Sequence, residues 1–154
     1  MTAGKSDDEA RLAFAAQPRR GSFDGIDLDL LDPADEDERA LLIRAEHPEL
    51  ADAIKRGDEE IELDGQAVNP RLHLTIHEIL AKQLWENDPP EVWRTARRLL
   101  DAGYERHEIL HMLGSALAPT LWALLHERGP TGTEGYVRAL ELLPASWEEQ
   151  RTGG

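Results

Sequence analysis

Three places in the sequence combine a helix-capping residue with a proline, and they divide the chain into helical segments. These pairs are Asp32-Pro33, Asn69-Pro70 and Asp88-Pro89. An Asp or Asn side chain accepts hydrogen bonds from the first backbone N–H groups of a helix, and proline is favoured at the first helical position. Each pair therefore predicts the start of a helix, and the pattern as a whole favours a mostly α fold.

Prolines and glycines further along predict where the helices end. We expect helices over about 33–46, 48–56, 70–86, 89–103, 105–127 and 133–143, with one last turn at Ser146–Glu149. Between Glu60 and Val68, weak alternation around Asp64-Gly65 predicts either a small hairpin or an irregular loop. The expected fold is a compact helical bundle of about three main helices plus shorter ones. Short links make sequential helices antiparallel, so the first and third main helices, 70–86 and 105–127, would run parallel.

The organisation along the chain follows from where large apolar residues are sparse. Residues 1–22 have few of them, and we expect this segment to be a disordered tail. Residues 23–143 are expected to form a single helical domain. Residues 144–154 are expected to form a C-terminal turn and tail.

Composition excludes several classes of partner and cofactor. The chain has 31 acidic and 17 basic residues, a net charge of −14, so neither nucleic acid nor an anionic membrane surface is an expected partner. It has no cysteine, which excludes disulfides, thiolate metal sites and a cysteine nucleophile. The first residues lack an apolar signal region and no apolar run is long enough to span a membrane, so we expect a cytoplasmic protein. The composition leaves open whether the chain binds a protein partner or forms a homo-oligomer.

Four of the six histidines form two pairs with helical spacing. His73 and His77 are four residues apart, and so are His107 and His111. Residues four apart lie on one face of a helix, about 40° from one another around its axis. The second pair also matches H-E-x-x-H, the zinc-binding pattern of many metalloprotease helices, with Glu108 as its glutamate. The remaining two, His47 and His126, stand alone, and we expect both to be solvated.

The predicted topology would bring the two pairs to the same end of the bundle. Four imidazoles there could hold one divalent metal ion, or part of a dinuclear site, with His73, His77, His107 and His111 as ligands. Imidazole suits zinc, copper, nickel and iron, whereas a carboxylate ligand such as Glu78 or Glu108 would favour iron or manganese. Zinc or iron is therefore the expected cofactor. The alternative is that the histidines bind no metal. Histidines at the edge of the core that hydrogen-bond to carbonyls and carboxylates would produce the same sequence pattern.

Several fixed spacings together resemble a known family. The segments are Asn69-Pro70-x-Leu72-His73-Leu74-x-x-His77-Glu78, Asp88-Pro89-Pro90 and Gly103-Tyr104-x-Arg106-His107-Glu108-x-x-His111-x-x-Gly114. Over roughly residues 35–125 the chain resembles a bacterial domain-of-unknown-function family of small acidic helical proteins with paired histidines. The resemblance implies a compact helical domain with a suspected metal site, and it implies no established activity.

Three functions fit these residues. The first is a metal-binding helical protein without catalysis. The second is a small metal-dependent hydrolase, in which Glu108 would be the general base that activates a metal-bound water. The third is a protein-interaction module that binds no metal and docks a basic partner on its acidic face. Against the hydrolase hypothesis, the sequence predicts little of the sheet that normally flanks an HExxH helix. The residues leave open whether the chain is an enzyme.

Overall fold

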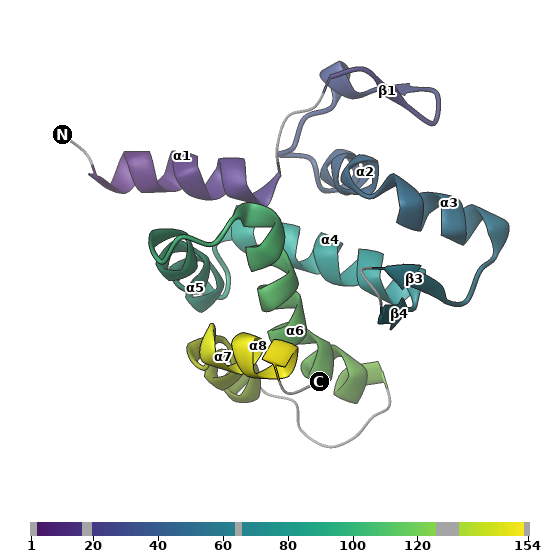
Figure 1. Ribbon diagram of the computed structural model, residues 1–154. Helices are drawn as coiled ribbons and strands as arrows, with labels where there is room; N and C mark the ends of the chain where they lie inside the picture. The colour runs from purple at the N-terminus through teal and green to yellow at the C-terminus, as the bar shows by residue number, and fades with distance from the viewer. Residues whose placement is uncertain (1–2, 17–19, 64–65, 126–132, 153–154) are drawn as a thin grey trace. The chain divides into compact units, whose positions relative to one another are not determined.

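The computed structural model describes residues 3–16, 20–63, 66–125 and 133–152. The fold is mostly helical, as the sequence predicts (Figure 1). The described residues form two small sheets of two strands each, whereas the sequence indicates at most one hairpin. The chain divides into two compact units, Met1–Trp85 and Glu86–Gly154, a boundary that lies inside the single domain expected over residues 23–143. No helix among the described residues is long and apolar enough to cross a membrane.

Among its described residues, the first unit holds four helices and two hairpins. The helices are α1 (Ala3–Ala15), α2 (Glu36–Glu46), α3 (Pro48–Arg56) and α4 (Pro70–Glu86), the last ending at the unit boundary. The hairpins are β1 (Ser22–Phe23) with β2 (Ile26–Asp27), and β3 (Ile61–Leu63) with β4 (Gln66–Val68); a short 3-10 helix, η1 (Leu28–Leu30), follows the first. Apolar side chains from α2, α3 and α4 form a core cluster: Ile43, Leu50, Leu74 and Ala81.

Helix α2 begins three residues later than Asp32-Pro33 predicts. The side chain of Asp35, not that of Asp32, caps the helix and accepts a hydrogen bond of 3.0 Å from the backbone N–H of Glu38. Pro33 lies in the preceding turn, where its carbonyl accepts a 2.9 Å hydrogen bond from the buried guanidinium of Arg39. The run of acidic residues offers several capping candidates, so the sequence places this start only approximately.

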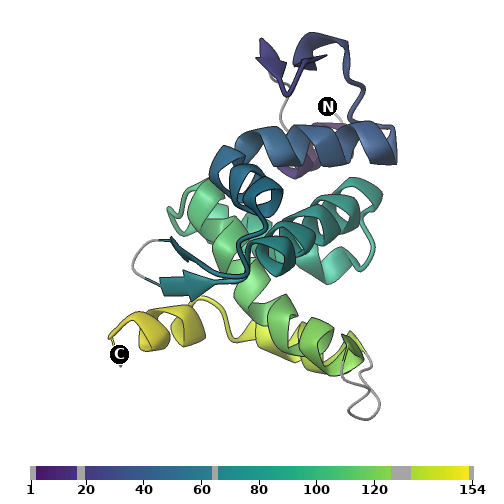
Figure 2. The same cartoon turned by 90° about the vertical axis from the view of Figure 1, so that its right-hand side faces the viewer.

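The predicted boundaries of α3, the hairpin and α4 are confirmed. Helix α3 ends at Gly57, whose φ of 78° is the left-handed conformation that glycine adopts without steric cost. Strands β3 and β4 pair antiparallel, with Ile61 opposite Val68 (Figure 2). Asp64-Gly65, the expected turn, lies outside the described residues. Asn69 then caps α4, and its Oδ1 accepts from the N–H groups of Arg71 and Leu72 at 3.0 and 3.1 Å.

The described part of the N-terminal segment differs from the expected disordered tail. Residues 3–15 form α1, and Phe14 at its end is buried. The guanidinium of Arg11 donates hydrogen bonds to the carbonyls of Leu84 and Trp85 at 2.7 and 2.6 Å. These carbonyls lie in the last turn of α4, where a helix leaves its C=O groups without partners of its own. Helix α1 thus takes its support from residues about 70 positions away.

The second unit consists of helices α5 (Pro90–Asp101), α6 (Arg106–Leu125), α7 (Thr133–Glu141) and α8 (Ala145–Thr152). Helix α5 begins one residue later than expected, with Pro89 as its N-cap and Pro90 at its first position. Pro119 lies inside α6, as the sequence predicts. The end expected for α6 near Glu127 and the residue His126 lie outside the described residues. The buried side chains of this unit include Leu99, Ile109, Met112, Leu113 and Leu140.

The C-terminal segment is more helical than the expected turn and tail. Helix α8 starts at Ala145, so Ser146 lies inside the helix and its N–H bonds to the carbonyl of Leu142 at 3.0 Å. Ser146 therefore does not cap a last turn with Glu149, and that prediction is wrong. From the sequence we expect the helices over 70–86 and 105–127, which correspond to α4 and α6, to run parallel. They belong to different units, so this arrangement stays a prediction.

Candidate metal centre

The histidine pair on α4 lies two turns behind the Asn69 cap. His73 and His77 have their Nε2 atoms 3.2 Å apart, and their ring centroids are 4.9 Å apart. His77 is buried, with 4% of its surface exposed, whereas His73 is half-buried. The i, i+4 spacing on a regular helix places the rings on one face, as the sequence predicts. Two imidazole nitrogens therefore meet at one point beside α4.

A third histidine of the same unit joins this pair, and sequence analysis missed it. His47 was expected to be solvated, but only 6% of its surface is exposed and its ring centroid lies 4.1 Å from that of His77. Its Nδ1 lies 2.9 Å from the carbonyl oxygen of Ile43. The one sequence signal that marks His47 is its place just before Pro48, where α2 must end and the chain turns a corner.

Glu78, considered as an additional ligand, lies beside a cation. Its Oε1 is 3.5 Å from Nε of Arg44 on α2. The side chain also lines a small pocket of about 200 Å³, together with Glu36, Arg39 and Lys82. Glu78 thus lies against a guanidinium, and the two imidazoles are the better placed donors for a metal ion.

The second histidine pair lies in the first two turns of α6. The ring centroids of His107 and His111 are 4.5 Å apart, His107 is exposed and His111 is half-buried. Glu108, between them, accepts a 3.1 Å hydrogen bond at Oε2 from the indole Nε1 of Trp147 on α8. The side chain of Glu108 is therefore anchored within the second unit. His73, His77 and His111 each offer a ring nitrogen that could be a metal ligand. That both pairs bind one ion stays a prediction from the sequence.

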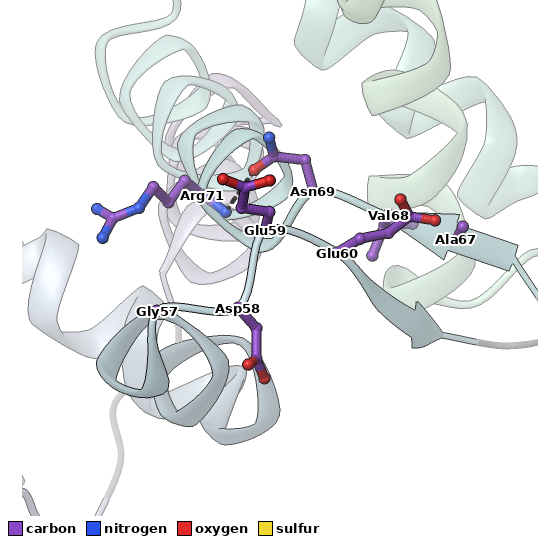
Figure 3. A pocket seen from close by; sticks show the side chains of 8 residues that line it. All are labelled: Gly57, Asp58, Glu59, Glu60, Ala67, Val68, Asn69 and Arg71. Carbon is purple, nitrogen blue, oxygen red and sulfur yellow. Dashed lines mark hydrogen bonds between the residues drawn. The ribbon is translucent and has the colours of Figure 1, made fainter.

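A larger pocket, of about 750 Å³, lies where the end of α3, the second hairpin and the start of α4 meet (Figure 3). Its lining residues are Gly57, Asp58, Glu59, Glu60, Ala67, Val68, Asn69 and Arg71. Sequence analysis did not single out this pocket. The lining contains none of the paired histidines. Its carboxylates are half-buried or exposed, so they are solvated and do not by themselves define a ligand site.

Fold and site together describe a small helical protein with histidine pairs on helix faces. A family model described as "Domain of unknown function (DUF1841)" matches residues 27–142, and the chain belongs to this family. This match confirms the family resemblance and extends it beyond the segment 35–125 on which the resemblance rests. Neither the curated proteins nor the solved structures gave a significant match.

Proposed function

We propose that this protein binds a divalent transition metal through the imidazoles of His73 and His77. The observation that carries the proposal is the separation of 3.2 Å between their Nε2 atoms. Two nitrogens bound at about 2.0–2.1 Å to a tetrahedral zinc ion lie about 3.3–3.4 Å apart. The two rings therefore need almost no movement to share one ion.

The donor atoms favour zinc, copper or nickel over harder metals. The carboxylates nearest the pairs in sequence have protein partners, because Glu78 lies beside Arg44 and Glu108 accepts from Trp147. Imidazole suits zinc, copper, nickel and iron, but non-haem iron sites combine two histidines with a carboxylate, and manganese and magnesium prefer oxygen. Of the two cofactors expected from the sequence, zinc and iron, this donor set supports zinc.

A direct hydrogen bond between the two rings is the competing explanation. One neutral imidazole can donate its Nε2–H to the Nε2 of the other, and the distance would be similar. In that case the pair would be a structural feature of α4, and the protein would need no metal. Metal binding and this hydrogen bond exclude one another, because both use the same lone pair.

The test is a zinc titration of protein purified without a histidine tag, with a chromophoric chelator as competitor. We expect His73→Ala and His77→Ala each to weaken binding by at least tenfold, because each removes one ligand. His126→Ala, which changes a histidine outside both pairs, serves as the matched control. Wild-type protein that binds no zinc, nickel or copper above the level of nonspecific binding would overturn the proposal.

The stoichiometry of the same titration tests the role of the second pair. A double variant, His107→Ala with His111→Ala, removes it completely. If each pair holds its own ion, the wild type binds two ions and the double variant binds one. If the pairs act together, as the sequence predicts, the wild type binds one ion and the double variant loses most of its affinity.

A further inference from the structure

We infer that His47 is a positioning residue for this metal site and that it holds the His77 ring in its ligating orientation. The inference rests on the proposed function and adds a residue that neither histidine pair contains. It starts from the contact between the two rings, whose centroids are 4.1 Å apart with the ring planes inclined at 40°. A ring packed this closely restricts the side-chain torsions of His77.

The His47 ring is itself fixed by its own hydrogen bond. Its Nδ1 lies 2.9 Å from the carbonyl oxygen of Ile43, which can only accept, so the ring donates an Nδ1–H there. A ring nitrogen that donates to a backbone carbonyl sets both the tautomer and the plane of the ring. Both His47 and His77 are buried, so water does not compete for this contact.

The backbone around His47 is equally constrained. His47 ends α2 and precedes the first residue of α3, Pro48. Its N–H donates to the carbonyl of Arg44 at 3.0 Å, and its own carbonyl accepts from Leu50 and Ala51 at 3.1 and 3.2 Å. The corner between the two helices therefore presents the imidazole at a set position. His47 supports one face of His77, while the Nε2 edge of His77 points to His73.

A preset ring loses less conformational entropy when it binds a metal ion. Loss of a residue that orients a metal ligand typically weakens metal affinity by about 10- to 100-fold. His47→Ala removes the packed ring, and we expect zinc affinity to fall within that range. His47→Phe keeps an aromatic ring against His77 but loses the Nδ1–H bond to the carbonyl of Ile43. We therefore expect it to lose less zinc affinity than His47→Ala does.

The experiment compares these two variants with a control that perturbs the same unit elsewhere. Leu42→Ala removes a buried side chain of α2 but no aromatic ring, and it should lower stability without changing zinc affinity. Zinc dissociation constants are measured by chelator competition at a temperature where circular dichroism shows every variant folded. If His47→Phe loses as much affinity as His47→Ala, a packed aromatic ring at position 47 does not orient His77, and the positioning role is wrong. Unchanged affinity in both variants also overturns it.

A second readout separates the failure of this inference from the failure of the proposed function. In zinc-free protein, the ring protons of His77 experience the ring current of residue 47 and give distinct NMR signals, identified by their loss in His77→Gln. Because His47→Ala itself removes that ring current, order is read from line widths: we expect the signals to stay sharp in His47→Phe and to broaden in His47→Ala, where the His77 ring exchanges between orientations. If the wild type binds no metal, the proposed function fails, and these line widths alone decide whether residue 47 orders the ring. Equal line widths in the wild type and His47→Ala would refute that ordering.

Discussion

Trp147 donates a 3.1 Å hydrogen bond from its indole Nε1 to Oε2 of Glu108, and this bond ties the last helix of the chain to the first turns of α6. A second contact, the 2.9 Å hydrogen bond from the Tyr104 hydroxyl to Glu148, joins the same two regions. The glutamate of the HExxH pattern thus has a protein partner inside its own unit. The strands described in the chain, β1–β2 and β3–β4, all belong to the other unit.

Glu108→Gln should leave the bound metal in place and change the free energy of unfolding by less than about 1 kcal/mol. The glutamine carbonyl can still accept from Trp147, so the variant keeps the hydrogen bond and loses only the charge. Metal content by elemental analysis and urea unfolding check the two outcomes. Loss of metal would identify Glu108 as a ligand and contradict this prediction.

The same variant tests the catalytic hypothesis for Glu108. A general base on a metal-bound water typically contributes about 10²- to 10⁴-fold to the rate, so any metal-dependent hydrolysis of ester or peptide probes should fall by that factor in Glu108→Gln. Trp147→Phe is the comparison, because it removes the hydrogen-bond donor and keeps the carboxylate. Hydrolysis that is equal in the wild type and Glu108→Gln would exclude this role.

Zinc should stabilise the folded chain in a pH-dependent manner. A ligand at about 100 times its dissociation constant adds about 2.7 kcal/mol to the free energy of unfolding. For a chain of this length, we expect the midpoint of thermal unfolding to rise by about 5–10 °C at neutral pH. Only neutral imidazole binds metal, so the gain should shrink on acidification below about pH 6. Differential scanning fluorimetry with zinc or with a chelator measures both effects. In His73→Ala a full zinc-dependent gain would be inconsistent with the proposed ligands.

Local signals in the sequence predicted those parts of the fold that depend on neighbours along the chain. Asn69-Pro70 starts α4 because one side chain caps two N–H groups within three residues. The pairing of the histidines was predicted for a similar reason, because i, i+4 spacing places two side chains on one face of a helix without any tertiary contact. The start of α2 was displaced because Asp35 competes with Asp32 for the same capping role.

Features that depend on distant residues could not be predicted from the sequence. Helix α1 gains its support from the carbonyls of Leu84 and Trp85, which no local pattern around Arg11 indicates. His47 contacts His77, thirty positions further along the chain, and no residue near His47 in the sequence indicates this contact. These contacts arise from how the helices of the first unit pack, and helix periodicity does not specify that packing.

Phe14→Ala should destabilise the first unit by about 3 kcal/mol. Phe14 is 6% exposed, and removing a buried phenylalanine ring loses apolar burial and leaves a cavity. Glu9→Ala, an exposed substitution on the same helix, should change stability by less than about 0.5 kcal/mol. Urea unfolding followed by circular dichroism distinguishes the two. If both variants unfold like the wild type, residues 1–22 act as the disordered tail that their composition predicts.

Tyr136 should make the stability of the second unit fall at alkaline pH. It is 3% exposed, and burial raises the pKa of its hydroxyl above the ordinary value of 10.0. Below pH 10 the hydroxyl is neutral in both states and the contribution to stability is complete. Above pH 10 the unfolded chain releases the proton while the folded chain retains it, so the free energy of unfolding falls by up to about 1.4 kcal/mol per pH unit. This loss continues until the pH reaches the raised pKa of the folded state.

Tyr136→Phe removes the ionisable group, so the wild type should lose stability faster than the variant between pH 10 and 11. Urea unfolding by circular dichroism at pH 8, 9, 10 and 11 gives the two profiles. Glu9→Ala, an exposed substitution that leaves both tyrosines in place, is the control and should keep the slope of the wild type. The raised pKa of Lys55 beside Asp24 also contributes at high pH, but it is common to all three proteins and cancels in their differences. Parallel profiles for the wild type and Tyr136→Phe would show that the hydroxyl ionises as readily in the folded chain as in the unfolded one.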